Sequence, residues 1–181
     1  MTQSLRQPLQ AATTLYANPY NLGAAGFYFT DAVDFMGKAA KLRDRFGDPV
    51  EKFELEYIDG DHGELFRACD IGQANLELWE EIEELDDWQK PALFYCLDII
   101  GMTTGEAMKK SVGCYAFEDY TVNQGTAKDY ADEYIDSAGM LDQMPENLRY
   151  YFNMDAFARD LVLNGDIYEF EYNGASFTGS R

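Results

Sequence analysis

Histidine and cysteine are scarce in this sequence of 181 residues, and that scarcity narrows the chemistry the protein can perform. His62 is the single histidine, and Cys69, Cys96 and Cys114 are too widely spaced for a metal-ligand pair or a disulfide framework. The sequence also contains no glycine-rich phosphate loop. We therefore predict no catalytic residue, no cofactor and no metal site, and we expect the cysteines to be buried as small hydrophobic side chains.

Long apolar runs are also missing. The longest, residues 91–97 and 99–102, are separated by Asp98 and fall well short of the roughly 20 residues that a membrane helix needs. Residues 1–10 include one arginine and no apolar core typical of a signal peptide. Because 46% of the residues are hydrophobic and 15% aromatic, the chain nevertheless has material for a folded core. We expect a cytoplasmic protein with no membrane partner.

Negative charge dominates the sequence, with a formal net charge of -19, and it is concentrated in two segments. Residues 54–87 contain thirteen acidic side chains and one basic one, and residues 118–146 contain eight acidic side chains and one basic one. The rest of the chain is balanced, with twelve acidic and twelve basic side chains. A generally solubilising surface would be acidic throughout, so the two segments favour a specific role. Such a surface repels phosphates, and we expect no nucleic-acid partner.

The pattern of strand, helix and turn residues predicts an α+β fold of three small domains. Residues 1–60 indicate an α+β domain, in which strands at 15–20, 26–29 and 50–58 accompany a helix that begins after Thr30 or Asp31. Residues 61–112 indicate an all-helical middle domain, broken near 71–72, 86–87 and 101–104. Residues 113–181 indicate a second α+β domain. Its predicted elements are a strand at 114–117, helices at 126–137, 146–152 and 155–163, a helix end at Gly165, a strand at 167–172 and a frayed tail at 173–181.

Two predicted helices are acidic on one face and apolar on the other. In the first, Leu78, Trp79, Ile82 and Leu85 share one face, and in the second an apolar stripe runs from Ala127 to Ile135. The acidic side chains are Glu77, Glu80, Glu81, Glu83, Glu84, Asp86 and Asp87 in the first, and Asp129, Asp132, Glu133 and Asp136 in the second. The first set would give about one charge per 2.4 Å of helix axis, against one per about 1.7 Å in duplex DNA. We predict that these eleven residues bind a basic partner surface.

A series of short motifs points to a known family. In the C-terminal third they are YADEYI (130–135), GMLD (139–142), PENL (145–148), YF (151–152) and AFARDL (156–161); near the N-terminus they are YN (20–21) and GFYF (26–29). In order and spacing the series resembles the ArdA antirestriction proteins, which plasmids, transposons and phages carry as counter-defence. The resemblance spans most of the chain.

The resemblance implies an elongated, three-domain protein without enzymatic activity that forms a homodimer through its C-terminal domain and mimics bent duplex DNA. The implied partner is a type I restriction-modification enzyme of the bacterial host, bound at the DNA groove of its methyltransferase and specificity subunits. Three alternatives stay open from the residues alone. They are a DNA mimic aimed at another defence system, such as an anti-CRISPR protein, an acidic adaptor for basic proteins, and an enzyme that uses carboxylates.

Overall fold

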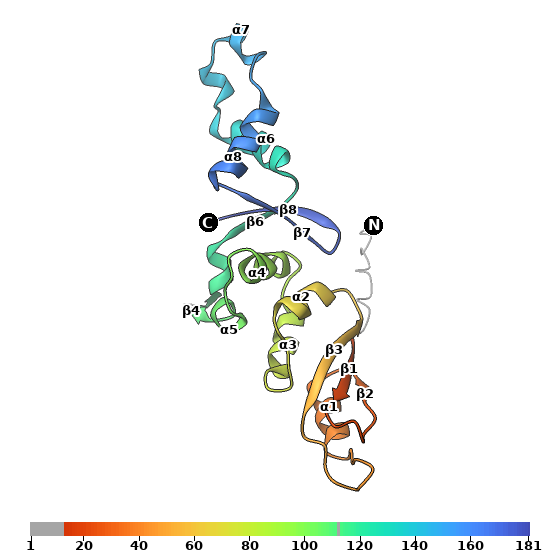
Figure 1. Ribbon diagram of the computed structural model, residues 1–181. Helices are drawn as coiled ribbons and strands as arrows, with labels where there is room; N and C mark the ends of the chain where they lie inside the picture. The colour runs from red at the N-terminus through yellow and green to blue at the C-terminus, as the bar shows by residue number, and fades with distance from the viewer. Residues whose placement is uncertain (1–12, 112) are drawn as a thin grey trace, which may run out of the picture. The chain divides into compact units, whose positions relative to one another are not determined.

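The computed structural model describes residues 13–111 and 113–181, and the chain separates into two compact units, Met1–Leu85 and Asp86–Arg181 (Figure 1). Both units combine helices with small antiparallel sheets, which confirms the predicted α+β class. The boundary between the units falls inside the segment 61–112, and the division into three domains stays a prediction. The polar leader at 1–10 lies outside the described residues.

A three-stranded antiparallel sheet forms the base of the first unit. It contains β1 (Thr14–Pro19), β2 (Phe27–Phe29) and β3 (Phe53–Asp59) in the order β2-β1-β3. The sequence predicted the three strands but not their order. The central strand β1 places Leu15 opposite Phe29 on one side and Tyr57 on the other. Leu15 and Ala17 are fully buried while Asn18 is exposed, because successive side chains of a strand point to opposite faces.

Three short helices accompany this sheet: α1 (Ala32–Ala39), α2 (Gly63–Ala68) and α3 (Leu76–Glu83). Asp31 caps α1 as predicted, since its side chain accepts a hydrogen bond from the backbone N–H of Asp34. Aromatic rings form the core beneath the helices in two clusters. One contains Phe27, Phe29, Phe35 and Phe53, and the other contains Tyr57, Phe66 and Trp79.

The second unit opens with α4 (Gln89–Asp98) and α5 (Thr104–Ala107). A minimal hairpin follows, formed by β4 (Lys110–Ser111) and β5 (Cys114–Tyr115), and then the 3-10 helix η1 (Ala116–Asp119). The predicted strand at 114–117 is therefore wrong beyond Tyr115. The backbone turns there because the Glu118 carboxylate accepts a hydrogen bond from the N–H of Tyr115, at 3.4 Å, and closes a helical turn.

A second antiparallel sheet contains β6 (Thr121–Gln124), β7 (Tyr168–Tyr172) and β8 (Ala175–Ser180) in the order β6-β8-β7. In Figure 1 this sheet lies between α4 on one side and the helices α6 and α8 on the other. The predicted frayed tail at 173–181 is wrong, because β8 is the central strand. A side chain at Gly179 would clash with the ring of Tyr95, so glycine is needed there.

The helical part of this unit contains α6 (Ala127–Ala138), η2 (Leu141–Gln143), α7 (Glu146–Arg149) and α8 (Met154–Asn164). The helices predicted at 126–137 and 155–163 are confirmed, whereas the one at 146–152 ends three residues early. Gly165 ends α8 in the left-handed conformation (φ +76°), as predicted. The core shared by α6 and α8 contains Ala127, Ala131, Ala158 and Ile167.

Cys69 and Cys96 are buried as predicted, but Cys114, in the two-stranded β4–β5 hairpin, is exposed, so the prediction is wrong for this cysteine. Among the helices of residues 13–111 and 113–181, none has the length and apolar character needed to cross a bilayer.

Candidate protein-binding faces

The helix α3 is buried on one side, as its sequence pattern predicted. Trp79 and Ile82 are at most 1% exposed, and the Trp79 ring packs edge-on against Phe66 with ring centroids 5.0 Å apart. Leu76 joins this buried face from the first turn, while Leu78, which was assigned to it, is only half-buried. The buried face anchors the helix, so its remaining side chains face outward.

The seven acidic residues predicted on this helix are divided by its actual length. The helix ends at Glu83, Glu84 is its C-terminal cap, and Asp86 and Asp87 are exposed at the start of the second unit, just before α4. The four acids within α3 are Glu77, Glu80, Glu81 and Glu83. They give about one charge per 3 Å of helix axis, a lower charge density than the predicted one charge per about 2.4 Å. A run of acids does not itself extend a helix, because like charges three or four residues apart repel.

Glu80 and Glu83 each bond to a residue outside α3. Glu80 Oε1 accepts a hydrogen bond from the backbone N–H of Ala32, at 2.8 Å, and so holds the first turn of α1. Glu83 accepts a hydrogen bond from the hydroxyl of Thr13. Both residues are partly shielded from solvent, whereas Glu77 and Glu84 are exposed. The outward charge of α3 is therefore carried most directly by Glu77 and Glu84.

Two aspartates from a distant part of the sequence extend the acidic surface of α3. Asp31 and Asp34, at the start of α1, line a shallow hollow together with Glu80, Glu83 and Glu84. The pKa of Asp31 lies below its ordinary value, mainly because the carboxylate accepts the hydrogen bond from the N–H of Asp34. Asp34 itself forms an ion pair with Lys38, at 2.7 Å. Sequence reasoning missed this contribution, since only the fold brings α1 to α3.

The helix α6 presents the second predicted face, and here the prediction of outward charge is confirmed. Ala127, Ala131 and Ile135 are buried, and all four acidic residues are exposed. These are Asp129, Asp132, Glu133 and Asp136. Tyr130 stacks on Tyr134 and Tyr134 stacks on Phe157 of α8, with ring centroids 6.2 and 6.3 Å apart, which fixes the rotation of the helix about its axis.

Asp129 has a structural role besides its charge. Its carboxylate accepts hydrogen bonds from the N–H of Thr126, at 2.8 Å, and from the Thr126 hydroxyl, at 2.7 Å, and so completes a capping box. These bonds stabilise the ionised carboxylate and hold its pKa below the ordinary value. Asp132, Glu133 and Asp136 are left as the exposed acidic face of α6, and we name these three residues the α6 face.

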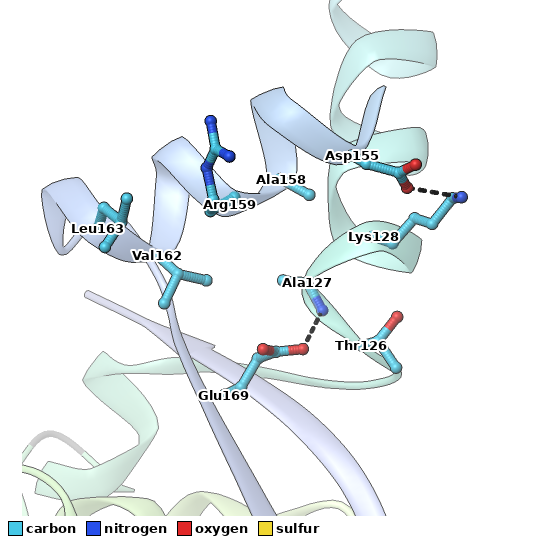
Figure 2. A pocket seen from close by; sticks show the side chains of 9 residues that line it. All are labelled: Thr126, Ala127, Lys128, Asp155, Ala158, Arg159, Val162, Leu163 and Glu169. Carbon is cyan, nitrogen blue, oxygen red and sulfur yellow. Dashed lines mark hydrogen bonds and ion pairs between the residues drawn. The ribbon is translucent and has the colours of Figure 1, made fainter. Parts of the chain in front are cut away.

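The first turn of α6 borders a groove that Figure 2 shows from close by. Glu169 of β7 accepts a hydrogen bond from the N–H of Ala127, at 2.6 Å, and Lys128 pairs with Asp155 of α8, at 2.8 Å. The hydrogen bond with Asp155 raises the pKa of Lys128 above its ordinary value. The bond from Ala127 joins α6 to the sheet and the ion pair joins it to α8, so the α6 face has a fixed position within the second unit.

Both acidic helices lack a basic residue in their last turn. The C-terminal end of a helix carries partial negative charge, which cations stabilise and acids destabilise. Asp136 of α6 and Glu83 of α3 lie at this unfavourable end, and repulsion between neighbouring carboxylates adds to the cost. Helix stability therefore does not explain the acids at these two C-terminal ends.

Comparison with known proteins gives a family. The family model described as antirestriction protein (ArdA) matches residues 35–174 of this chain. The matched segment includes α3, α6 and every acidic residue predicted to bind a partner. No curated protein matches the chain.

Proposed function

This chain belongs to the ArdA family of antirestriction proteins, and we propose that it inhibits a type I restriction-modification enzyme by occupying the enzyme's DNA groove in place of DNA. In this proposal the groove is the one formed by the methyltransferase and specificity subunits. The chain contributes no chemistry of its own. It excludes DNA competitively, and the acidic residues of α3 and α6 take the positions of phosphates.

The observation that carries the proposal is the α6 face. Asp132, Glu133 and Asp136 are exposed on one side of a helix whose other side is fixed by Ala131 and Ile135 in the core. Carboxylates held in this way can each accept hydrogen bonds from lysine or arginine side chains, which are the groups that bind phosphates in a DNA groove. Because the scaffold is already folded, little conformational entropy is lost on binding.

Salt sensitivity follows from this mechanism. DNA-binding proteins with several phosphate contacts lose about 10³ to 10⁵ in affinity between roughly 50 and 200 mM salt. Binding releases counterions from the DNA, and a higher salt concentration opposes that release. The carboxylates of this chain are less closely spaced than phosphates and condense fewer counterions. We therefore expect inhibition to weaken with salt in the same direction but with a smaller slope.

We also propose that the protein acts as a homodimer that pairs through its C-terminal region. Supporting this, the connection between α6 and α8 exposes several large apolar side chains, among them Leu148, Tyr150 and Tyr151, which are 46%, 90% and 78% exposed. Exposed aromatic residues clustered in one segment are typical of an interface. Light scattering after chromatography should give a dimer mass, and the double variant Tyr150→Ser/Tyr151→Ser should shift it toward the monomer.

The three-domain, elongated shape is part of the same proposal. A compact globule of 181 residues would have a radius of gyration near 16 Å and cover only about 12 base pairs. Filling a longer groove requires domains arranged end to end, or a dimer, or both. Small-angle X-ray scattering on a monomeric variant measures this directly. A radius of gyration near 16 Å would contradict the elongated arrangement.

A pair of charge-reversal variants tests the proposed function. The test variant replaces the α6 face by Asp132→Lys, Glu133→Lys and Asp136→Lys. The control makes the same change in net charge at exposed acids outside the two acidic segments, with Asp98→Lys, Asp166→Lys and Glu171→Lys. Displacement of labelled duplex DNA from a purified type I methyltransferase is then measured for both.

We expect the test variant to displace DNA far less effectively than the control, with a reduced dependence on salt. If both variants lose DNA displacement to the same extent, only net charge matters, which is the behaviour of an acidic adaptor. An unrelated basic protein added in excess would relieve inhibition by such an adaptor. If the wild-type chain itself displaces no DNA, the target is another DNA-binding defence enzyme.

A further inference from the structure

One part of the first unit has the opposite charge from the acidic faces. Between Lys38 and Lys52 there are five basic and three acidic side chains, a net of +2 in a chain whose total is -19. Lys41, Arg43 and Arg45 are all exposed. This segment connects α1 to β3, and its loop lies against residues 21–24 of the β1–β2 connection.

The loop is held in one conformation by Asp44. Its carboxylate accepts hydrogen bonds from the backbone N–H groups of Phe46 and Asp48, at 2.9 and 3.0 Å, and from the Asn21 amide, at 3.0 Å. The backbone N–H of Asp44 donates to the carbonyl of Asp48, at 2.9 Å. Gly47 supplies the left-handed conformation that this turn requires, with φ +89°. A loop closed by so many bonds loses little freedom when a partner binds.

Arg45 joins the two loops. Its backbone N–H donates to the carbonyl of Gly23, at 3.0 Å, and its side-chain stem lies against Gly23 so closely that a Cβ there would be 3.4 Å from Cγ. Its guanidinium carbon lies 4.7 Å from the centroid of the Phe46 ring. Phe46 on one loop and Leu22 on the other are nevertheless 75% and 100% exposed. We name Leu22, Lys41, Arg43, Arg45 and Phe46 the basic loop surface.

A rigid surface that exposes an aromatic ring, an aliphatic side chain and an arginine has the composition of a binding hot spot. Exposure of Leu22 and Phe46 contributes nothing to folding, because neither side chain is removed from water. A groove lined with lysine and arginine would repel Lys41, Arg43 and Arg45, so the basic loop surface does not bind in such a groove. The complementary partner surface has an apolar centre and carboxylates around it.

We infer that the basic loop surface is a second contact with the inhibited enzyme, docking on an apolar, carboxylate-rimmed patch of its protein surface outside the DNA groove. This inference rests on the proposed function. The acidic faces exclude DNA, while the basic loop surface adds affinity through apolar burial, which salt does not screen. The two surfaces therefore differ in the salt dependence of their contributions.

The test uses the full chain and the same DNA-displacement measurement. The double variant Leu22→Ala/Phe46→Ala removes the apolar centre, and Arg45→Glu reverses the central charge while keeping the backbone bond to Gly23. The control, Ile100→Ala/Leu163→Ala, removes exposed apolar side chains from the second unit. Far-UV circular dichroism checks that every variant is folded.

We expect both test variants to raise the concentration needed for half-displacement about tenfold, with the control equal to wild type. For the double variant, which removes only apolar contacts, the slope against salt should stay unchanged. Displacement by the double variant that equals wild type would overturn the inference and leave the proposed function standing. Absence of displacement by the wild-type chain would overturn both. Binding of single-stranded oligonucleotide that depends on Phe46 would assign the surface to nucleic acid instead and also overturn the inference.

Discussion

Glu80 on α3 accepts a hydrogen bond from the backbone N–H of Ala32, 2.8 Å away, at the start of α1. A residue in the middle of an acidic run thus acts as a cap for a helix 48 positions earlier. The bond shows that acidic residues of the same helix divide into those that stabilise the fold and those that are available to a partner.

Removing the Glu80 carboxylate should destabilise the first unit. We expect Glu80→Ala to lower the free energy of unfolding by roughly 1 kcal/mol, because a helix N-terminal N–H loses its acceptor. Glu80→Gln keeps an oxygen acceptor and should lower the free energy of unfolding by less. Urea denaturation followed by circular dichroism measures both. Glu77→Ala, at an exposed position of the same helix, is the control and should be close to neutral; an equal loss there would refute the capping role.

Gly179 should tolerate no side chain. In Gly179→Ala the new Cβ would overlap the ring of Tyr95, which is buried at the centre of the second unit. Overpacking of this kind typically costs about 1 to 3 kcal/mol. Gly105→Ala is the matched control, because a Cβ there meets no atom within 4 Å and the residue lies in α5. Thermal unfolding that leaves the two variants indistinguishable would contradict the packing described.

The three cysteines should differ in reactivity. Burial, and secondarily the charge of Asp119, raise the pKa of Cys96 to about 12, so its thiolate is scarce at neutral pH. Cys69 is also buried, whereas Cys114 is exposed. Iodoacetamide at neutral pH should modify Cys114 in the folded protein and the other two only after unfolding, as mass spectrometry of peptides would reveal. Rapid labelling of Cys96 in the native protein would be inconsistent with its burial.

The capping box of α6 should make stability depend on acid pH. The Asp129 pKa is lowered in the folded protein by bonds from Thr126, so its stabilising contribution is fully present above the ordinary value of 3.8. It is lost as the pH falls through the lower folded value. Asp129→Asn should therefore flatten the dependence of unfolding on pH below about 4. An NMR titration that places the Asp129 pKa above 3.8 would contradict this assignment.

Periodicity was sufficient to predict the elements that bury a regular apolar stripe. The strands β1, β2 and β3 and the helices α1, α6 and α8 were located from alternating or helical patterns and from caps such as Asp31 and Gly165. The strand β8 was missed because Gly179 and Thr178, which are buried in it, are neither large nor apolar. Gly179 packs against Tyr95, more than 80 positions away, which no local pattern reveals.

The candidate site was predictable only in part for a similar reason. Helical spacing placed Asp132, Glu133 and Asp136 outward, and they are exposed. It could not separate them from Glu80, which serves as a cap, or include Asp31 and Asp34, which reach the α3 surface through the fold. Charge reversal of the α6 face is consequently a cleaner test of binding than reversal of α3, where Glu80→Lys would also remove a cap.

The most direct test of the central claim is DNA cleavage by a purified type I restriction enzyme, titrated with the wild-type protein at about 50 and about 200 mM salt. At the lower salt, a DNA mimic should stop cleavage at close to one protein or one dimer per DNA-binding groove of the enzyme. The higher salt should partly restore cleavage. Full cleavage at both salt concentrations and at all protein concentrations would contradict the proposed target. Inhibition of equal strength at both would contradict an electrostatic, phosphate-like mode of binding.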